Sequence, residues 1–145
     1  MKKIILVLFL VFLYGCASTT ETTTNTTTTS TNVVTTQSTR IPFDSSYSGK
    51  YNLKEFYKDN ELISIEYEYN YIEIDEVGLF LIKNKLNDVV TSLRGICFIE
   101  GNSIKFVFTV EGIDVTNAYN IGENNTLIFE SNVGNYQVKL VYEKE

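Results

Sequence analysis

The sequence contains no histidine among its 145 residues. Histidine supplies the general base of the common catalytic triads and many of the ligands of zinc sites. Its absence therefore excludes those triads, His-based general bases and the usual zinc sites.

Carboxylates are the remaining candidates for acid–base chemistry or for a hard metal ion. The spacing of the acids does not match a calcium-binding loop. Glu66 and Glu68 alternate with tyrosines, which is typical of the solvent face of a strand. We therefore expect no enzyme, no catalytic residues, no metal site and no cofactor. The enzymatic alternative is a hydrolase that uses the densest group of acids, namely Glu66, Glu68, Glu73, Asp75 and Glu76.

The chain also lacks a run of basic residues. It has 12 Lys and Arg against 18 Asp and Glu, a formal net charge of −6, and its lysines are scattered among acids along the sequence. Neutralisation of phosphates by basic groups is the main source of affinity for nucleic acids. We therefore expect no nucleic acid partner, and no domain that lies flat on anionic lipid.

Only one long apolar run is present, and it lies at the N-terminus. Lys2 and Lys3 precede eleven apolar residues, 4–14. A helix of that length spans about 16 Å, which is half of a membrane's hydrocarbon core. The run is too short for a stable span but matches the hydrophobic region of a secretory signal peptide, and Gly15 is the small residue expected before the cleavage site.

The motif Leu13-Tyr14-Gly15-Cys16 resembles the lipobox of bacterial lipoproteins, although Tyr14 stands where Ala or Ser is more usual. The resemblance implies cleavage between Gly15 and Cys16 and attachment of a diacylglycerol to the Cys16 thiol. Two or three acyl chains, such as palmitate, are what stable anchoring requires. An ordinary secreted protein, or an uncleaved anchor with an incidental cysteine, is the alternative.

The stretch after the motif is dominated by threonine. Residues 18–39 include 13 Thr and 3 Ser, with Val33 and Val34 as the only apolar members. Such a segment cannot bury enough surface to offset its ordering entropy, so we expect a disordered tether with ends about 25 Å apart. It could also be an O-glycosylated stalk. We divide the chain into a signal peptide (1–15), the lipidated cysteine and tether (16–40) and one domain (41–145).

Cys97 is the only other cysteine. It has no disulfide partner if Cys16 is lipidated, even though the compartment would permit a disulfide. Because it lies in the apolar run 95–99, we expect a buried structural thiol. A reactive thiol is the alternative, but the sequence offers no histidine to activate it.

The domain shows the period-two alternation of half-buried antiparallel strands. Turn signals rich in Gly, Asn and Asp separate the strands at regular intervals. The clearest inner faces are Ile104, Phe106, Phe108 and Val110; Ile113, Val115, Tyr119 and Ile121; and Tyr136, Val138, Leu140 and Tyr142. We predict an all-β, up-and-down meander of about eight strands. Closing it into a barrel would remove two exposed edges, which invite aggregation.

The alternation changes phase in residues 63–74. Apolar residues hold the odd positions up to Tyr71 and the even positions from Ile72. A one-residue slip of this kind flips the two faces, so we expect a bulge, or a bend or short turn, at Asn70. Residues 71–75 should then pair with 79–83 through the turn Glu76-Val77-Gly78. Tyr67 and Tyr69, which precede the slip, are the expected exposed pair.

Residues 49–142 resemble the small lipocalin-like domains of bacterial lipoproteins. Gly49-Lys50-Tyr51 stands where lipocalins carry Gly-x-Trp, with Tyr in place of Trp. The strand and turn of residues 71–78 and the closing hairpin formed by 127–129 and 136–142 also match their pattern. The resemblance implies a barrel or half-barrel that holds an apolar ligand.

These observations predict a monomeric lipoprotein held on the extracytoplasmic face of the cell membrane by its N-terminal lipid. Its domain is expected to be a non-enzymatic binding module for a small apolar ligand or an envelope component. The alternative is a structural or protein-interaction lipoprotein with a filled core, acting through exposed strand edges and aromatics. The candidate ligand or partner surface comprises Tyr67, Tyr69 and Tyr71.

Overall fold

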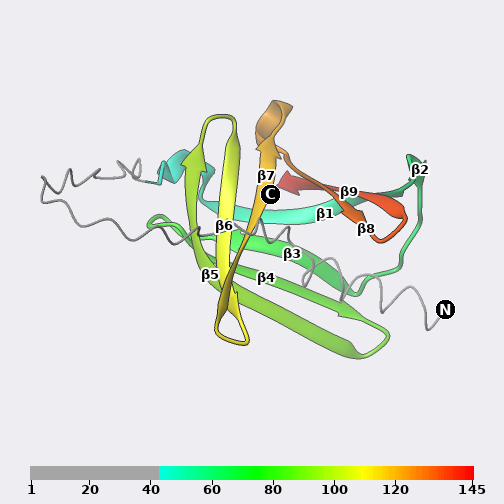
Figure 1. Cartoon of the computed structure of the whole chain (residues 1–145). Coiled ribbons are helices and arrows are strands. Elements are labelled where there is room, and N and C mark those ends of the chain that lie inside the picture. Colours follow the sequence, from blue (N-terminus) through cyan, green and yellow to red (C-terminus); the bar gives the residue numbers. More distant parts are fainter. Residues whose placement is uncertain (1–42) are drawn as a thin grey trace, which may run out of the picture.

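Residues 43–145 are the part of the chain that this computed structural model describes, and they contain nine strands and two short 3₁₀ helices (Figure 1). The predictions for Gly15, Cys16 and the tether lie outside the described residues. The helices are η1 (Ser45–Tyr47) and η2 (Glu123–Asn125). The strands are β1 (Gly49–Lys58), β2 (Glu61–Leu62), β3 (Tyr69–Ile74), β4 (Leu79–Leu86), β5 (Val89–Glu100), β6 (Ser103–Val110), β7 (Ile113–Ile121), β8 (Leu127–Val133) and β9 (Tyr136–Lys144).

The strands form one antiparallel sheet that closes on itself. Their order is β2-β1-β3-β4-β5-β6-β7-β8-β9, and β1 also pairs with β9. Eight strands therefore form a closed barrel, and the two-residue β2 is an addition on β1. The prediction of an all-β meander that closes is confirmed, because closure gives the first and last strands of the meander a partner each.

Two of the turns follow directly from their sequence. Asp59 and Asn60 join β1 to β2 with φ of 52° and 66°, and Asn87 and Asp88 join β4 to β5 with φ of 49° and 63°. Two successive positive φ angles are typical of the type I′ turn, whose twist matches that of the flanking strands. Asn and Asp tolerate this conformation better than other non-glycine residues.

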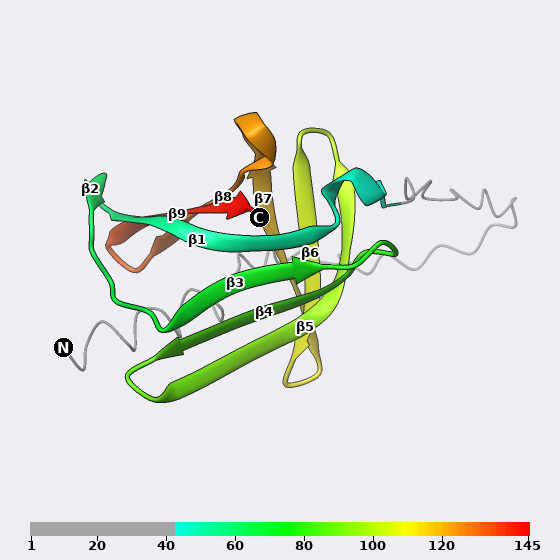
Figure 2. The ribbon, with the colours of Figure 1, turned by 180° about the vertical axis from the view of Figure 1, so that it is seen from behind.

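Gly95 allows β5 to change partners at a corner of the barrel. The first part of β5 pairs with β4 as far as Ile96, and from Ile96 onward the strand pairs with β6. Figures 1 and 2 show β5 beside β4 and then beside β6. A Cβ atom on Gly95 would overlap the carbonyl oxygen of Val107 and lie 2.8 Å from the ring of Phe80. A glycine is therefore required where the two strands approach this closely.

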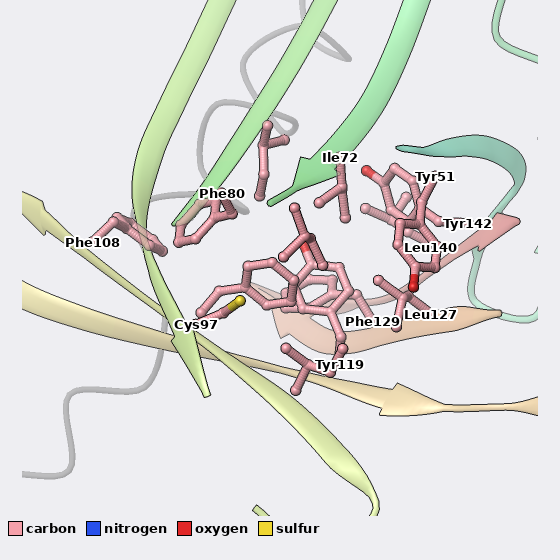
Figure 3. Packing of buried hydrophobic residues seen from close by; sticks show 14 of the residues in the cluster. Tyr51, Ile72, Phe80, Cys97, Phe108, Tyr119, Leu127, Phe129, Leu140 and Tyr142 are labelled. Atoms are coloured by element: carbon pink, nitrogen blue, oxygen red, sulfur yellow. The ribbon is translucent and has the colours of Figure 1, made fainter. Parts of the chain in front are cut away.

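The barrel interior is filled by aromatic and aliphatic side chains. Figure 3 shows them converging from several strands on one centre. Ring centroids lie 4.8 Å apart for Phe80 and Phe106, 4.7 Å apart for Phe106 and Tyr119, and 5.1 Å apart for Tyr119 and Phe129. These contacts have the tilted or edge-to-face geometry that aromatic pairs prefer. The interior is thus a packed core built from rings on β4, β6, β7 and β8.

The phase slip in residues 63–74 lies earlier than the sequence predicted. Residues 63–68 are not a strand, the chain bends at Glu68, and β3 begins at Tyr69. Asn70 lies within β3 and is buried, so the predicted bend at Asn70 is wrong. The predicted hairpin is confirmed, since Tyr71 pairs with Lys83 and Ile74 with Phe80.

Two residues assigned to inner faces lie outside the core. Ile113 is 67% exposed and Tyr136 is 42% exposed. Each is the first residue after a hairpin turn, where the strands extend beyond the packed interior. The remaining members of those inner faces point inward as predicted.

Replacing Gly95 with Ala should lower the free energy of unfolding by about 2–3 kcal/mol, because the added methyl overpacks the corner against backbone. Gly101→Ala is the matched control. It adds the same methyl where nothing lies within 4 Å, at a φ of +60°, and should cost only about 1 kcal/mol of backbone strain. Urea unfolding followed by circular dichroism measures the free energy of unfolding of both variants. Equal decreases in the two would contradict the steric role of Gly95.

Candidate functional site

A groove of about 700 Å³ opens in the barrel wall between β1 and β3. It exists because the two strands pair only over residues 49–52 and 71–74. Beyond Asn52, β1 stays with β9 across a bulge between Leu53 and Glu55, while β3 stays with β4. We call this hollow the β1–β3 groove.

Residues 63–68 cross the opening as a connecting segment from β2 to β3, as Figure 2 shows. Ile63 donates its backbone N–H to the carbonyl of Phe56 at 2.8 Å, and Glu68 donates to the carbonyl of Lys85 at 3.0 Å. Ile63 and Ile65 pack against the core, while Ser64 is exposed. The segment thus alternates like a strand but is held by side chains and isolated hydrogen bonds rather than by a ladder.

The groove has an apolar side and a polar rim. Its apolar side is formed by side chains that also contact the core, and its rim carries lysine, asparagine, tyrosine and one glutamate, Glu68. Such a surface suits a ligand that has both apolar faces and polar groups. The apolar lining includes Leu53, Phe56, Ile63 and Ile65, and the rim includes Lys50, Asn52, Lys54, Tyr69, Tyr71 and Lys83.

Tyr69 and Tyr71 lie together on the rim, both half-buried. Their ring centroids are 5.9 Å apart and their planes are inclined by 47°. The Lys50 ammonium lies 5.2 Å from the centre of the Tyr71 ring, and that of Lys83 lies 5.5 Å from the centre of the Tyr69 ring. Each tyrosine is therefore positioned beside a cation, an arrangement in which the ring face attracts the charge.

Tyr67 differs from the exposed residue that the sequence predicted. Its hydroxyl oxygen is buried and has no hydrogen-bond partner among the described residues. Burial raises the pKa of Tyr67 to about 12, and the Asn70 side chain partly opposes the shift. The Asn70 side chain does not form a hydrogen bond with this hydroxyl. Instead its Oδ1 accepts from the Tyr142 hydroxyl at 3.2 Å inside the barrel. Asn70 shares the inward face of β3 with Ile72 and Ile74, so the change of phase falls before it.

Sequence reasoning missed the clustering of lysines at the groove. Lys83 lies far along the sequence from Lys50 and Lys54, yet all three line it. Lys50 and Lys54 form ion pairs with Glu145 at 2.8 Å and Glu143 at 3.4 Å. Lys83 forms no ion pair within residues 43–145. The register of β3 with β4, which places Lys83 opposite Tyr71, was the available signal.

The acids singled out in the sequence do not converge on a reaction centre. Asp75 accepts hydrogen bonds from the backbone N–H groups of Val77 at 3.0 Å and Leu79 at 2.8 Å, and so shapes the β3–β4 turn. Glu68 pairs with Lys85 at 2.6 Å, and Glu66 is exposed. Within the described part of the chain, no three His, Cys, Asp or Glu side chains are grouped so that they could hold a metal ion.

Cys97 lies inside the barrel and away from the groove. It is only 6% exposed, and Figure 3 shows its sulfur among the core side chains. Burial raises the pKa of its thiol to about 12. A thiol with so little thiolate is a poor nucleophile, in keeping with a structural residue.

Comparison of the chain with protein-family models, with curated proteins and with solved structures returns no match. Among residues 43–145, no helix has the length and apolar character needed to cross a membrane.

Replacing Tyr67 with Phe should leave the free energy of unfolding unchanged or raise it by up to about 1 kcal/mol, because the change removes a buried hydroxyl that has no partner. Tyr142→Phe is the matched variant. It leaves Asn70 Oδ1 without its donor and should cost about 1–2 kcal/mol. Urea unfolding measures the free energy of unfolding of both variants. A decrease for Tyr67→Phe as large as that for Tyr142→Phe would contradict the statement that the Tyr67 hydroxyl has no hydrogen-bond partner.

Proposed function

We propose that this chain is a lipid-anchored, non-enzymatic binding module that holds an envelope component in the β1–β3 groove. The observation that supports this most directly is the opening in the wall of a filled barrel, with apolar side chains inside and a tyrosine–lysine rim. A rigid barrel that presents such a groove can bind without a change of fold.

A small apolar ligand inside the barrel has less support. The rings of Phe80, Phe106, Tyr119 and Phe129 are in mutual contact across the interior. The groove in the wall is the better candidate, because it opens to solvent and mixes polar with apolar groups.

A protein-interaction role is the second candidate, and one observation favours it. Where β1 and β3 diverge, Leu53 to Glu55 on one side and Tyr69 and Asn70 on the other have no ladder partner across the groove. Edges of this kind can accept an added strand. A protein partner would then use the same groove.

The anchor is proposed from the sequence. Two lysines, an apolar run of residues 4–14 and the lipobox-like motif ending in Cys16 support export and lipidation. The threonine-rich tether would hold the domain about 25 Å from the membrane, within reach of envelope polymers.

Growth with labelled palmitate tests the anchor. We expect the label in the wild-type chain, its loss in Cys16→Ser, and its retention in Cys97→Ser, because only Cys16 lies in the lipobox-like motif. Label that persists in Cys16→Ser would contradict lipidation at this position.

Cosedimentation with isolated cell envelopes tests the groove. The mature chain, residues 16–145 with Cys16→Ser to remove the anchor, should bind. The double variant Tyr69→Ala/Tyr71→Ala should bind about tenfold more weakly, since aromatic anchors carry much of the energy of an interface. Tyr136→Ala is the control: this tyrosine is also beside a lysine, with Lys58 Nζ 3.6 Å from its ring centre, but it does not line the groove. Equal losses of envelope binding in the double variant and in Tyr136→Ala would exclude the groove as the binding site.

A further inference from the structure

We infer that the envelope component bound in the β1–β3 groove is a glycan whose sugars carry carboxylate groups. This inference rests on the proposed function and specifies its ligand. The observation behind it is that the rim of the groove already binds a carboxylate of the chain itself, that of Glu145.

The Glu145 carboxylate is held by two donors from β1. Lys50 Nζ donates to Glu145 Oε1 at 2.8 Å, and Asn52 Nδ2 donates to the same oxygen at 2.9 Å. The hydrogen bond from Lys50 lowers the pKa of Glu145, because it favours the ionised form of the carboxyl group. An ammonium and an amide that converge on one oxygen form a carboxylate-binding pair, and both residues line the groove.

The carboxylate that occupies this pair is easily exchanged. The side chains of Lys50 and Glu145 are 38% and 56% exposed, and those of the neighbouring pair Lys54 and Glu143 are 56% and 53% exposed. Exposed ion pairs contribute little net stability and are screened by salt. A carboxylate on a ligand can therefore replace Glu145 at Lys50 and Asn52 without a large loss of protein stability.

Lys83 supplies a further cation on the opposite side of the groove. It comes from β4, lies beside the Tyr69 ring and has no acidic partner among the described residues. The groove is thus lined by three lysines and by one acid, Glu68, which pairs with Lys85, in a chain whose formal net charge is −6. Local positive charge on an acidic protein is complementary to a ligand with separated negative charges, such as acidic sugars along a chain.

Tyr69 and Tyr71 offer a surface on which the sugar rings of the glycan can pack. Tyr69 and Tyr71 present half-buried rings at a centroid separation of 5.9 Å along one edge of the groove. A tyrosine offers an apolar face and a polar tip, which matches the apolar face and hydroxyl edge of a sugar. A nucleic acid is disfavoured, because its dense charge would be repelled by the many acids elsewhere on the domain.

Isothermal titration calorimetry on the mature chain, residues 16–145 with Cys16→Ser, tests the inference. The probes are a galacturonate hexamer, which carries carboxylates, a neutral N-acetylglucosamine hexamer and a 12-nucleotide single-stranded oligothymidylate. We expect the galacturonate hexamer to bind at least about tenfold more tightly than either of the other two, with an affinity that falls as salt is added.

Variants separate the groove from general charge effects. Lys83→Gln should weaken galacturonate binding by about fivefold, because it removes a cation from the rim. Lys139→Gln is the control, since Lys139 also lies beside a tyrosine, Tyr57, but outside the groove. Glu145→Ala should tighten binding by about threefold, because it frees Lys50 and Asn52. Glu130→Ala, which removes the acidic partner of Lys139, should leave the affinity unchanged.

Three results would overturn the inference: equal affinity for the acidic and neutral hexamers, tighter binding of the oligothymidylate, or no effect of Lys83→Gln and Glu145→Ala. If neither hexamer binds while the chain still cosediments with envelopes through Tyr69 and Tyr71, the inference that the ligand is an acidic glycan is wrong and the proposed function stands. If cosedimentation also fails, both are wrong.

Discussion

One pairing pattern underlies the candidate site: β1 has two neighbours in the closed barrel and pairs with only one of them along most of its length. It follows β9 from Tyr51 to Lys58, which closes the barrel, and it follows β3 only over residues 49–52. The wall must then open beyond Asn52. Residues 63–68 cross that opening without a ladder, and the β1–β3 groove is what remains. Closure of the fold and the opening of the groove are therefore two results of one pairing pattern.

The same pattern determines which side chains meet at the groove. Asn52 pairs with Tyr71, and Tyr71 pairs with Lys83, so three strands contribute to one outward-facing row. Behind this row the interior is occupied by aromatic rings, which leaves the wall rather than the barrel centre as the place for a ligand. The rim already binds a carboxylate, that of Glu145, and this contact indicates the chemistry that the groove can accept.

Local patterns in the sequence were sufficient to predict the strands, most of the turns and closure of the barrel. The alternation of Ile104, Phe106 and Phe108 and the Asn87-Asp88 turn are signals that a few neighbouring residues carry. The site depended on contacts between distant residues. Asn70 accepts a hydrogen bond inside the barrel from Tyr142, 72 residues away, and no local signal reveals that partner. The predicted hairpin places Lys83 beside Tyr71, but the meeting of Lys83 with Lys50 and Lys54 depends on the β1–β3 register, which the sequence does not display.

The central claim is that the β1–β3 groove is the binding site of this domain. The most direct test is to follow the backbone amide resonances of the mature chain, residues 16–145 with Cys16→Ser, as the galacturonate hexamer is added. The account predicts that shifts concentrate at residues 50–54, 63–71 and 83 and at Glu145, because these surround the groove or occupy its carboxylate-binding pair. Shifts that concentrate instead at the hairpin ends near Ile113 and Tyr136, with the groove residues unchanged, would contradict it.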